Sequence, residues 1–504
     1  MMKNNKLLRV FSAMLALVML VAVMAVFSSC GNTGDGEETG SETTSGTTGD
    51  KNPGGDGDRK TQYDDLEKKA YNKSLKVISM PSCVTEFRPD EDNKGQLVTD
   101  KMIARNLRLK NDFGVTVEVE ECSDYSEIND TMTKQQSGTL DDYDIYVGQL
   151  QNFKNNALQN HCVDYNEMAY VDLSGEWWDA SCRDTLVMTG KNFMMTGDIS
   201  PYSMLISACM AFNKDMMEDL KKTEPYALVK SNEWTLDKLY EYIDGVTNSS
   251  AQDGRGQYGM TCWEYDVPYS MFYGCGETFV KFDNETGDPT VSFNNAKAID
   301  IYDKIFKTIV TAESLFCTLT DDMMGEENPD AEAYETFADG RSLFVDITLS
   351  KISKFITSME DDYGVVPMPK YDVAQNDYLT FVNGAAPMFM VATTEKDVSF
   401  VGHMLEAMAT YNYQEVTDDL YETVCKSTDL RDPDSADMVD IILRSRVYDF
   451  AYYAQLPVAD VVYGNLAAGR DSVATAFKAA STSSKNMLTM MIRDWNKIQS
   501  QIKK

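Results

Sequence analysis

The chain has 504 residues and carries 46 Lys and Arg against 80 Asp and Glu, which gives a formal net charge of −34. At roughly 100–200 residues per domain, this length corresponds to about two to four domains or to one large two-lobed unit. The composition, with 43% hydrophobic and 25% charged residues, excludes a disordered chain and a multi-span membrane protein. The acidic excess argues against nucleic-acid binding, and with His161 and His403 as the two histidines, His-rich metal sites are nearly excluded and a Ser-His-Asp hydrolase would have to use one of them.

The first thirty residues have the pattern of an export signal. Residues 1–9 carry three basic residues and no acidic one, and an apolar run from 10 to 27 follows. This pattern is typical of a signal peptide, although the run is also about long enough for an uncleaved membrane anchor. The sequence Ser-Ser-Cys-Gly at 28–31 resembles a bacterial lipoprotein signal, with Phe27 where Leu is usual. The resemblance implies cleavage before Cys30 and diacylation of its sulfur.

Residues 31–60 predict a flexible tether. Gly, Thr, Ser, Asp, Glu, Asn and Lys make up almost all of this segment, and no apolar periodicity interrupts them. Such a composition cannot bury a hydrophobic core. At roughly 5–6 Å × √n, the segment has a mean reach of about 30 Å. We therefore expect a flexible tether that holds a folded domain near a membrane.

Cysteine usage favours free thiols. Nine of the ten cysteines follow Cys30, and an odd number cannot all pair within one chain. Exported proteins often pair their cysteines, but this sequence has no CxxC metal spacing. Several of the cysteines lie in apolar runs, where the residue commonly serves as a small buried hydrophobe. We expect mostly unpaired cysteines.

The residues that follow the tether alternate between strand and helix patterns. The pattern predicts strands at 75–78, 115–119 and 143–147, and helices at 102–113 and near 125–137. A β-α-β-α-β order implies a parallel sheet with helices on its faces. Ligands of such sheets lie beyond the carboxyl ends of the strands. Residues 79–82 and 148–151, which include Gln149 and Gln151, are therefore candidate site positions.

The rest of the chain continues this α/β pattern and ends in helices. We expect a helix that begins after an N-cap at Thr235, a helix at 295–309, strands at 342–347 and 363–366, and mainly helices from about 397, including 472–502. No internal repeat and no second linker are evident. Two lobes that share interwoven chain therefore fit better than separate domains in a row.

Several short motifs together resemble a known family, the extracellular solute-binding proteins of ABC importers, family 1, which is the carbohydrate-binding group. The motifs are Met210–Asp215, Asn232–Asp237, Gly340–Val345 and Tyr363–Pro369, with Trp177–Asp179 and Gly197–Ser200 typical of a longer subgroup. Their order and spacing over roughly residues 73–500, behind a lipoprotein signal, make the set specific.

The resemblance implies a two-lobed α/β fold of the type II periplasmic-binding-protein-like class, with parallel-type sheets flanked by helices and a ligand cleft between the lobes. It implies a monomer that delivers solute to a permease, without catalysis, cofactor or metal. We expect a signal peptide (1–29) and a lipidated tether (30–70), followed by the first part of lobe 1 (71–207) and the first part of lobe 2 (208–375). The chain then returns to lobe 1 with a crossing segment (376–412), and a C-terminal helical part (413–504) closes lobe 2 and the hinge.

A sugar site needs aromatic faces for stacking, and carboxylates and amides for paired hydrogen bonds. By the resemblance, Trp263, Glu264 and Tyr265 supply an acid and an aromatic to the cleft from the second lobe. The further candidates are Tyr269, Gln149, Trp178 beside Trp177, Asp198, Ser200 and Tyr202 before the first crossing strand, Asp346 and Thr348 at a strand end, and Asn383 and Gly384 near a return crossing. Trp234 and Trp495 occupy helical positions that predict core packing.

Other functions remain open from the sequence alone. A calcium-like loop that begins at Asp90 fails because Lys101 stands where the loop needs Glu, and the acidic stretch 321–330 is expected to be a solvated loop. A secreted glycosidase would need two carboxylates about 5–9.5 Å apart. A third possibility is a binding protein for peptides or another solute class, which would need charged anchors, and Glu264 and Arg341 are candidates for them. We expect a lipid-anchored, extracytoplasmic receptor for an oligosaccharide.

Overall fold

The structure is a computed structural model, and it describes most of the chain that follows the tether. The described residues are 66–89, 97–123, 125–140, 143–150, 154–249, 255–283, 287–318, 330–356, 359–422 and 433–502. The signal peptide, Cys30 and the tether segment up to residue 65 lie outside them. So do the calcium-like loop at 90–95, Gln151, the acids at 321–327 and Cys425. Glu67–Lys504 form one compact unit.

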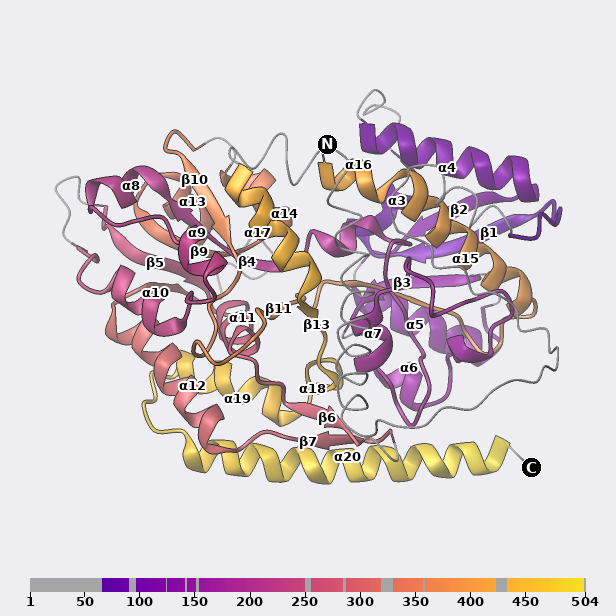
Figure 1. Cartoon of the computed structure of the whole chain (residues 1–504). Coiled ribbons are helices and arrows are strands. Elements are labelled where there is room, and N and C mark those ends of the chain that lie inside the picture. The colour runs from indigo at the N-terminus through magenta and orange to yellow at the C-terminus, as the bar shows by residue number, and fades with distance from the viewer. Residues whose placement is uncertain are drawn as a thin grey trace, which may run out of the picture. The chain divides into compact units, whose positions relative to one another are not determined.

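The first lobe is built on a four-stranded sheet in the order β12-β3-β1-β2 (Figure 1). Its strands are β1 Ser74–Ser79, β2 Thr116–Glu121, β3 Ile145–Gln149 and β12 Pro387–Met390. β1 pairs in parallel with both β2 and β3, and β12 runs antiparallel to β3. The predicted parallel β-α-β-α-β unit is therefore confirmed, and one strand from much later in the chain completes its edge.

Helices cover this sheet because the connections between parallel strands must cross its faces. They include α4 Leu97–Phe113, α5 Tyr125–Gln136, α6 Lys154–Leu158, α7 Ala180–Thr185, α15 Val398–Glu415 and α16 Thr417–Glu422, with the short α3 Val84–Phe87 after β1. α15 packs against α4, and most of its side chains are buried. Two segments about 300 residues apart in the sequence thus share one layer.

The second lobe is built on a five-stranded sheet in the order β10-β4-β9-β5-β8. Its strands are β4 Ala208–Asn213, β5 Tyr258–Trp263, β8 Leu315–Cys317, β9 Ser342–Thr348 and β10 Tyr363–Val366. β5 is parallel to β8 and β9, whereas β4 is antiparallel to β9 and β10. All residues of β4 and β9 are buried, which explains their nearly continuous apolar sequence. The strands predicted at 342–347 and 363–366 are confirmed.

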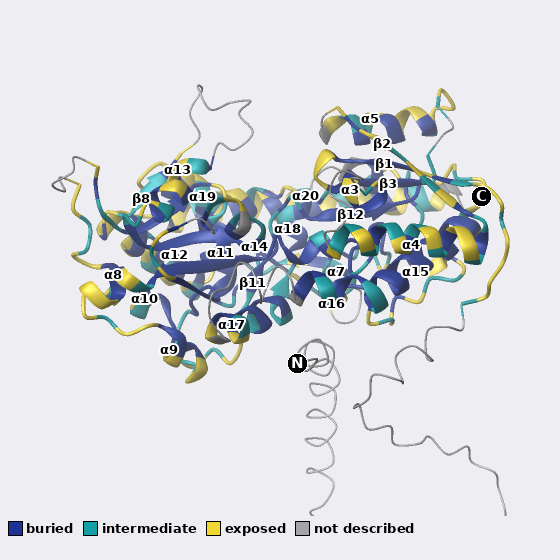
Figure 2. Ribbon diagram, turned by 90° about the horizontal axis from the view of Figure 1, so that it is seen from above, coloured by how far each residue is buried: buried dark blue, intermediate teal, exposed yellow. Residues whose placement is uncertain are grey.

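The helices of the second lobe surround this sheet. They are α8 Lys214–Asp219, α9 Tyr226–Lys230, α10 Leu236–Ile243, α11 Val267–Gly274, α12 Ala296–Phe306, α13 Ala331–Ala338, α14 Leu349–Lys351, α17 Pro433–Arg444, α18 Phe450–Tyr453 and α19 Pro457–Ala467. The side chain of Thr235 accepts the backbone N–H of Lys238, so the predicted N-cap of α10 is confirmed. Figure 2 shows buried strands at the centre of each lobe and exposed outer faces on the helices.

Three segments run side by side where the chain passes between the two sheets, and we call them the crossing segments: 205–208, 380–387 and 445–448. An isolated antiparallel bridge joins Ser207 to Val382. β11 (Thr380–Phe381) pairs in parallel with β13 (Arg446–Val447). The backbone N–H of Asn383 donates to the carbonyl of Ile206 at 3.2 Å. Main-chain hydrogen bonds therefore hold the three crossing segments together.

The last helix, α20 Ala474–Ile502, has 29 residues and contacts both lobes (Figure 1). Near its start, the Phe477 ring lies 4.6 Å from the Phe293 ring of the second lobe. Near its end, the Trp495 ring lies 5.0 Å from Phe193, and Gln499 donates to Asn160 at 2.8 Å. The helix predicted at 472–502 is confirmed, and so is the buried position of Trp495.

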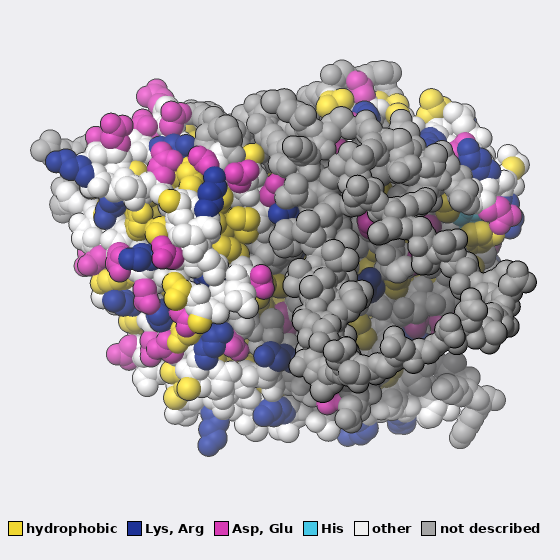
Figure 3. Space-filling model, in the orientation of Figure 1, with side chains coloured by type: hydrophobic (Ala, Val, Ile, Leu, Met, Phe, Trp, Pro, Cys, Tyr) yellow, Lys and Arg dark blue, Asp and Glu magenta, His cyan; other side chains and the backbone are white. Residues whose placement is uncertain are grey.

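The described residues show how charged side chains, cysteines and apolar helices are distributed. On the described part of the face in Figure 3, Asp and Glu side chains are intermixed with Lys and Arg side chains. The eight cysteines within the described residues are buried and form no disulfide bond, as expected. Among the described helices, none combines the length and the apolar character needed to cross a bilayer.

We predict that Trp234 is a main stabilising residue of the second lobe. Its side chain is fully buried, its Nε1 donates to the carbonyl of Pro367 at 2.9 Å, and its ring stacks on Phe344 at 5.8 Å. Trp234→Ala should lower the free energy of unfolding by about 3–5 kcal/mol, because it leaves a cavity and an unpaired carbonyl. Urea denaturation measures this change. Leu107→Ala, at an exposed position of α4, should change it by less than about 0.5 kcal/mol.

Candidate functional site

A cavity of about 610 Å³, which we call the central cavity, lies between the two lobes at the crossing segments. The last residues of β3, β5 and β9 reach it: Gln149, Trp263 and Thr348. β5 and β9 are parallel, so their carboxyl ends lie at the same edge of the sheet. This topology explains why residues distant in sequence meet at one place.

Eight of the predicted ligand-binding residues line the central cavity. They are Gln149, Tyr202, Trp263, Tyr265, Tyr269, Thr348, Asn383 and Gly384. Binding of a ligand by these residues stays a prediction, but the structure brings them together from both lobes and from a crossing segment. A ligand in this cavity would contact each of these three parts.

Aromatic rings form one wall of the cavity. The Trp263 and Tyr265 rings lie 5.8 Å apart, and the Tyr265 ring lies 5.1 Å from Tyr463 at an angle of 30°. Tyr265 is 41% exposed, although large apolar faces are usually buried. A solvent-accessible aromatic face at a cavity is suited to stacking against the C–H face of a sugar ring.

A second aromatic group lies beside the first. The Tyr269 ring packs edge-on against Tyr452 at 4.9 Å, and the Tyr269 hydroxyl donates to Oδ1 of Asp460 at 3.0 Å. Burial, followed by the nearby charge of Asp460, raises the pKa of Tyr269. The hydroxyl therefore remains protonated and acts as a hydrogen-bond donor.

Charged groups gather at another part of the cavity. Nζ of Lys351 lies 2.7 Å from Oδ2 of Asp330, and Nδ2 of Asn383 donates to Oδ1 of Asp266 at 2.5 Å. Burial and the charge of Asp330 raise the pKa of Asp266 to about 7, against the opposing effects of Lys351 and Asn383. The cavity thus offers both hydrogen-bond donors and acceptors.

Five predicted residues do not line the central cavity. One of them is Ser200, whose buried hydroxyl donates to Glu86 at 2.6 Å. Glu264 is buried beside Trp263, and Oδ1 of Asp198 accepts a hydrogen bond from Thr417 at 3.0 Å. Nε1 of Trp178 donates to Glu406 at 3.0 Å in the buried part of the first lobe, where Trp177 is buried as well. Asp346 is buried and accepts a hydrogen bond from Ser270 at 3.1 Å; burial raises its pKa. The proposed site therefore does not include these five residues.

Several cavity residues were not predicted. They are Ile206, Asp266, Asp330, Ser350, Lys351, Ala385, Tyr452, Asp460 and Tyr463. The prediction of a solvated acidic loop at 321–330 is wrong for Asp330, which is 7% exposed because it is packed beside Lys351. Ser350 and Lys351 directly follow β9, so the rule that ligands lie beyond strand ends could have found them.

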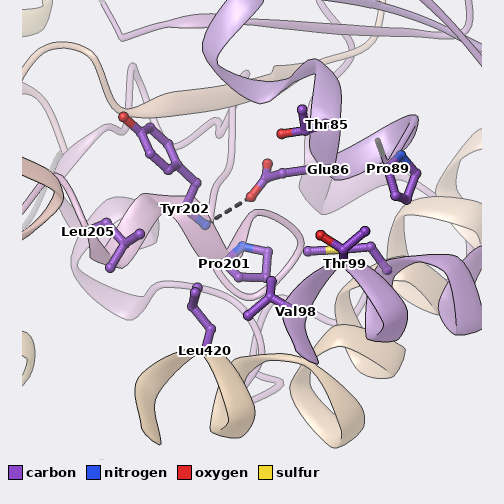
Figure 4. A pocket seen from close by; sticks show the side chains of 10 residues that line it. Thr85, Glu86, Pro89, Val98, Thr99, Pro201, Tyr202, Leu205 and Leu420 are labelled. Carbon is purple, nitrogen blue, oxygen red and sulfur yellow. Dashed lines mark hydrogen bonds between the residues drawn. The ribbon is translucent and has the colours of Figure 1, made fainter. Parts of the chain in front are cut away.

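A smaller pocket of about 230 Å³ lies in the first lobe and shares Tyr202 with the central cavity (Figure 4). Glu86 accepts hydrogen bonds from the Tyr202 backbone N–H at 2.9 Å and from the Ser200 hydroxyl at 2.6 Å. Burial raises the pKa of Glu86 to about 7, although these two hydrogen bonds oppose the shift. The Glu86 carboxyl group therefore fixes the loop that carries Tyr202 to the central cavity.

We predict a pH-dependent stability that is due to Asp266. Its pKa is raised from 3.8 to about 7, so between these pH values the folded protein holds a proton that the unfolded chain has released. The free energy of unfolding must therefore fall as the pH rises through this window, and the Asp266 contribution levels off above it. Asp266→Asn keeps a neutral side chain at every pH. In urea denaturation its stability relative to wild type should rise from pH 5 to pH 8, whereas a constant difference would contradict the prediction.

Comparison with solved structures shows the fold. The chain is similar to a cyclo/maltodextrin-binding protein complexed with maltotetraose, at 14% identity and a TM-score of 0.51, over 84% of this chain and 96% of that one. A maltose-binding periplasmic protein from Listeria monocytogenes in complex with maltose gives 13% identity and a TM-score of 0.53, over 83% and 98% of the two chains. An ABC substrate-binding protein from Listeria monocytogenes in complex with cycloalternan gives 11% identity and a TM-score of 0.50, over 85% of this chain and 99% of that one. The predicted two-lobed, periplasmic-binding-protein-like fold is therefore confirmed.

Comparison of the sequence with curated proteins finds no match. The family model described as bacterial extracellular solute-binding protein matches residues 108–420, which is more than half of the chain. This match confirms the resemblance that the sequence motifs indicate. The protein therefore belongs to the family of bacterial extracellular solute-binding proteins.

Proposed function

We propose that this protein captures an oligosaccharide in its central cavity outside the membrane and delivers it to the permease of an ABC importer. The central cavity carries the proposal. Its volume of about 610 Å³ falls within the range of about 300–1,000 Å³ for small-molecule sites, and its lining combines aromatic faces with hydroxyl, amide and carboxyl groups. This combination matches both surfaces of a sugar, the C–H faces and the ring of hydroxyls.

Movement of the lobes about the crossing segments is the proposed mechanism. Ile206 and residues 383–385 line the cavity and belong to crossing segments, so a bound ligand touches the chain about which the lobes would rotate. A ligand that contacts both lobes binds the closed form better than the open form, and it shifts the population toward the closed form. The permease would then recognise the closed form. Capture needs no covalent step, and we propose no catalytic residue.

Two alternatives from the sequence have weaker support. The charged anchors suggested for a peptide ligand, Glu264 and Arg341, do not line the cavity, and Arg341 pairs with Asp339 at 3.3 Å. A glycosidase would have to use carboxylates of the cavity, such as Asp266 and Asp330. The family to which the chain belongs consists of solute-binding proteins. Turnover of a glycan by the purified protein would nevertheless overturn the proposal.

We predict that Trp263 contributes to glycan binding. Residues 67–504 would be screened by thermal shift against mono- and oligosaccharides, amino acids and short peptides. A ligand at 100 times its Kd stabilises the folded state by about 2.7 kcal/mol, which raises the melting temperature. Trp263→Ala should weaken binding of the oligosaccharide that gives the shift by about tenfold or more, because a central aromatic contact is lost.

Tyr240→Ala is the matched control for Trp263→Ala. Tyr240 lies on α10, outside the central cavity, so its removal should leave the thermal shift unchanged. Shifts with peptides alone would contradict the choice of a sugar. The absence of a shift with every compound would contradict the proposed solute classes.

We also propose that the protein is held at the outer face of the membrane through lipid on Cys30. The full-length chain, expressed in a bacterial host and labelled with radioactive palmitate, should incorporate the label. Cys30→Ser should abolish the labelling, because the hydroxyl does not replace the thiol in this modification. Ser29→Ala keeps a small residue before the cysteine and should retain the label. An unlabelled wild-type protein, or a labelled Cys30→Ser variant, would refute the anchor.

A further inference from the structure

The central cavity contains a charged corner formed by Asp266, Asp330 and Lys351, which we call the acidic corner. Asp266 directly precedes α11, Asp330 directly precedes α13, and Lys351 ends α14. All three residues line the central cavity. None of them belongs to the ligand-binding residues that the sequence predicts.

Asp266 and Asp330 do not cap the helices that they precede, although their positions favour this role. Asp at an N-cap usually accepts a hydrogen bond from a backbone N–H in the first turn of the helix. Asp266 and Asp330 occupy N-cap positions, yet neither side chain makes a capping hydrogen bond. In the same lobe, Asn213, Thr235 and Asn295 do cap their helices. Two missing N-cap hydrogen bonds at one cavity indicate that these carboxylates have a functional rather than a helix-capping role.

Asp330 has an unsatisfied oxygen. Its Oδ2 lies 2.7 Å from Nζ of Lys351, whereas its Oδ1 is buried and makes no hydrogen bond of normal geometry. The buried hydroxyl of Tyr334 makes none either, although it lies close enough to interact with this carboxylate. The residue is 7% exposed, so bulk water does not solvate the carboxylate freely. A buried acceptor without a donor costs free energy. A donor supplied by a molecule in the central cavity would remove this cost.

The charges of the acidic corner restrict what that molecule can be. Asp330 is already paired with the single ammonium group of Lys351, and Asp266, with its pKa raised to about 7, is only partly ionised at neutral pH. Asp460 adds a further carboxylate to the lining of the same cavity. A ligand that brought its own carboxylate would face the like charges of these groups in a partly buried space, where repulsion is stronger than in bulk water. A hydroxyl or amino group would instead donate to Oδ1 of Asp330.

We propose that the acidic corner selects glycans whose bound unit presents hydroxyl or amino donors, and that it excludes glycans that carry carboxylates, such as uronates. This inference rests on the proposed function. Asp330 acts here as a specificity-determining residue, and Lys351 holds its carboxylate in place. The aromatic wall stacks on a sugar ring whatever its charge, so discrimination falls to the acidic corner.

The test compares matched trisaccharides by isothermal titration calorimetry. The probes are trisaccharides of glucose, galactose, mannose and xylose, the glucosamine trimer, and the uronate trimers of glucose, galactose and mannose with the same linkages. The wild-type protein should bind at least one neutral or amino trisaccharide, and bind the matched uronate at least about 100-fold more weakly. The ratio should shrink at high salt because ions screen the repulsion.

Asp330→Asn assigns the discrimination to the corner. It removes one negative charge and keeps the shape, so the ratio between the neutral trisaccharide and its uronate should fall by about tenfold or more. Asp339→Asn removes a carboxylate from a surface ion pair of the same lobe, and it should leave the ratio unchanged. The wild-type comparison needs no variant, so it decides the proposal even if Asp330→Asn does not fold.

Three results would overturn the inference. Uronate binding as tight as neutral binding would refute the exclusion of acidic glycans. An unchanged ratio in a folded Asp330→Asn variant would refute the role of Asp330 while leaving the proposed function intact. Failure of the wild-type protein to bind any trisaccharide would refute the proposed function, and the inference with it.

Discussion

The arrangement of this protein depends on the main-chain hydrogen bonds among the three crossing segments. The Ser207–Val382 bridge and the pairing of β11 with β13 fix where one sheet ends and the other begins. Unpaired backbone groups in this buried region would be costly, so the segments must pair with one another. The chain can therefore pass between the lobes several times and still form one continuous floor for the central cavity. The same residues join the lobes and line the site.

Much of this fold could be predicted from the sequence because its elements have strong local patterns. Strict alternation of apolar residues in β2 and the helical spacing in α4 identify these elements without tertiary information. Gln149, Trp263 and Thr348 could be proposed as site residues because they stand at the ends of strand-like or motif-bearing segments. Such a position is a local property of the chain.

The rest of the site could not be predicted, because it depends on contacts between distant segments. Tyr269 meets Asp460, 191 residues later, only because α19 packs against α11. The indole of Trp178 is buried because Glu406, 228 residues later, accepts its N–H. Asp330 belongs to an acidic run that is typical of a solvated loop, and only the approach of Lys351 explains its burial. A sequence pattern carries no information on such pairings.

The path of the chain assigns different mechanical roles to the lobes. Tyr71, close to the start of the described chain, packs on Phe400 and hydrogen-bonds His403 in the first lobe. The C-terminal end of α20 also reaches the first lobe, through Trp495. The second lobe is thus formed by two excursions of the chain, one from β4 to β10 and one from α17 to α19, and the first lobe holds the chain before, between and after them. A pull applied upstream of Glu67 therefore acts on the first lobe, and the second lobe lies outside the path of that load.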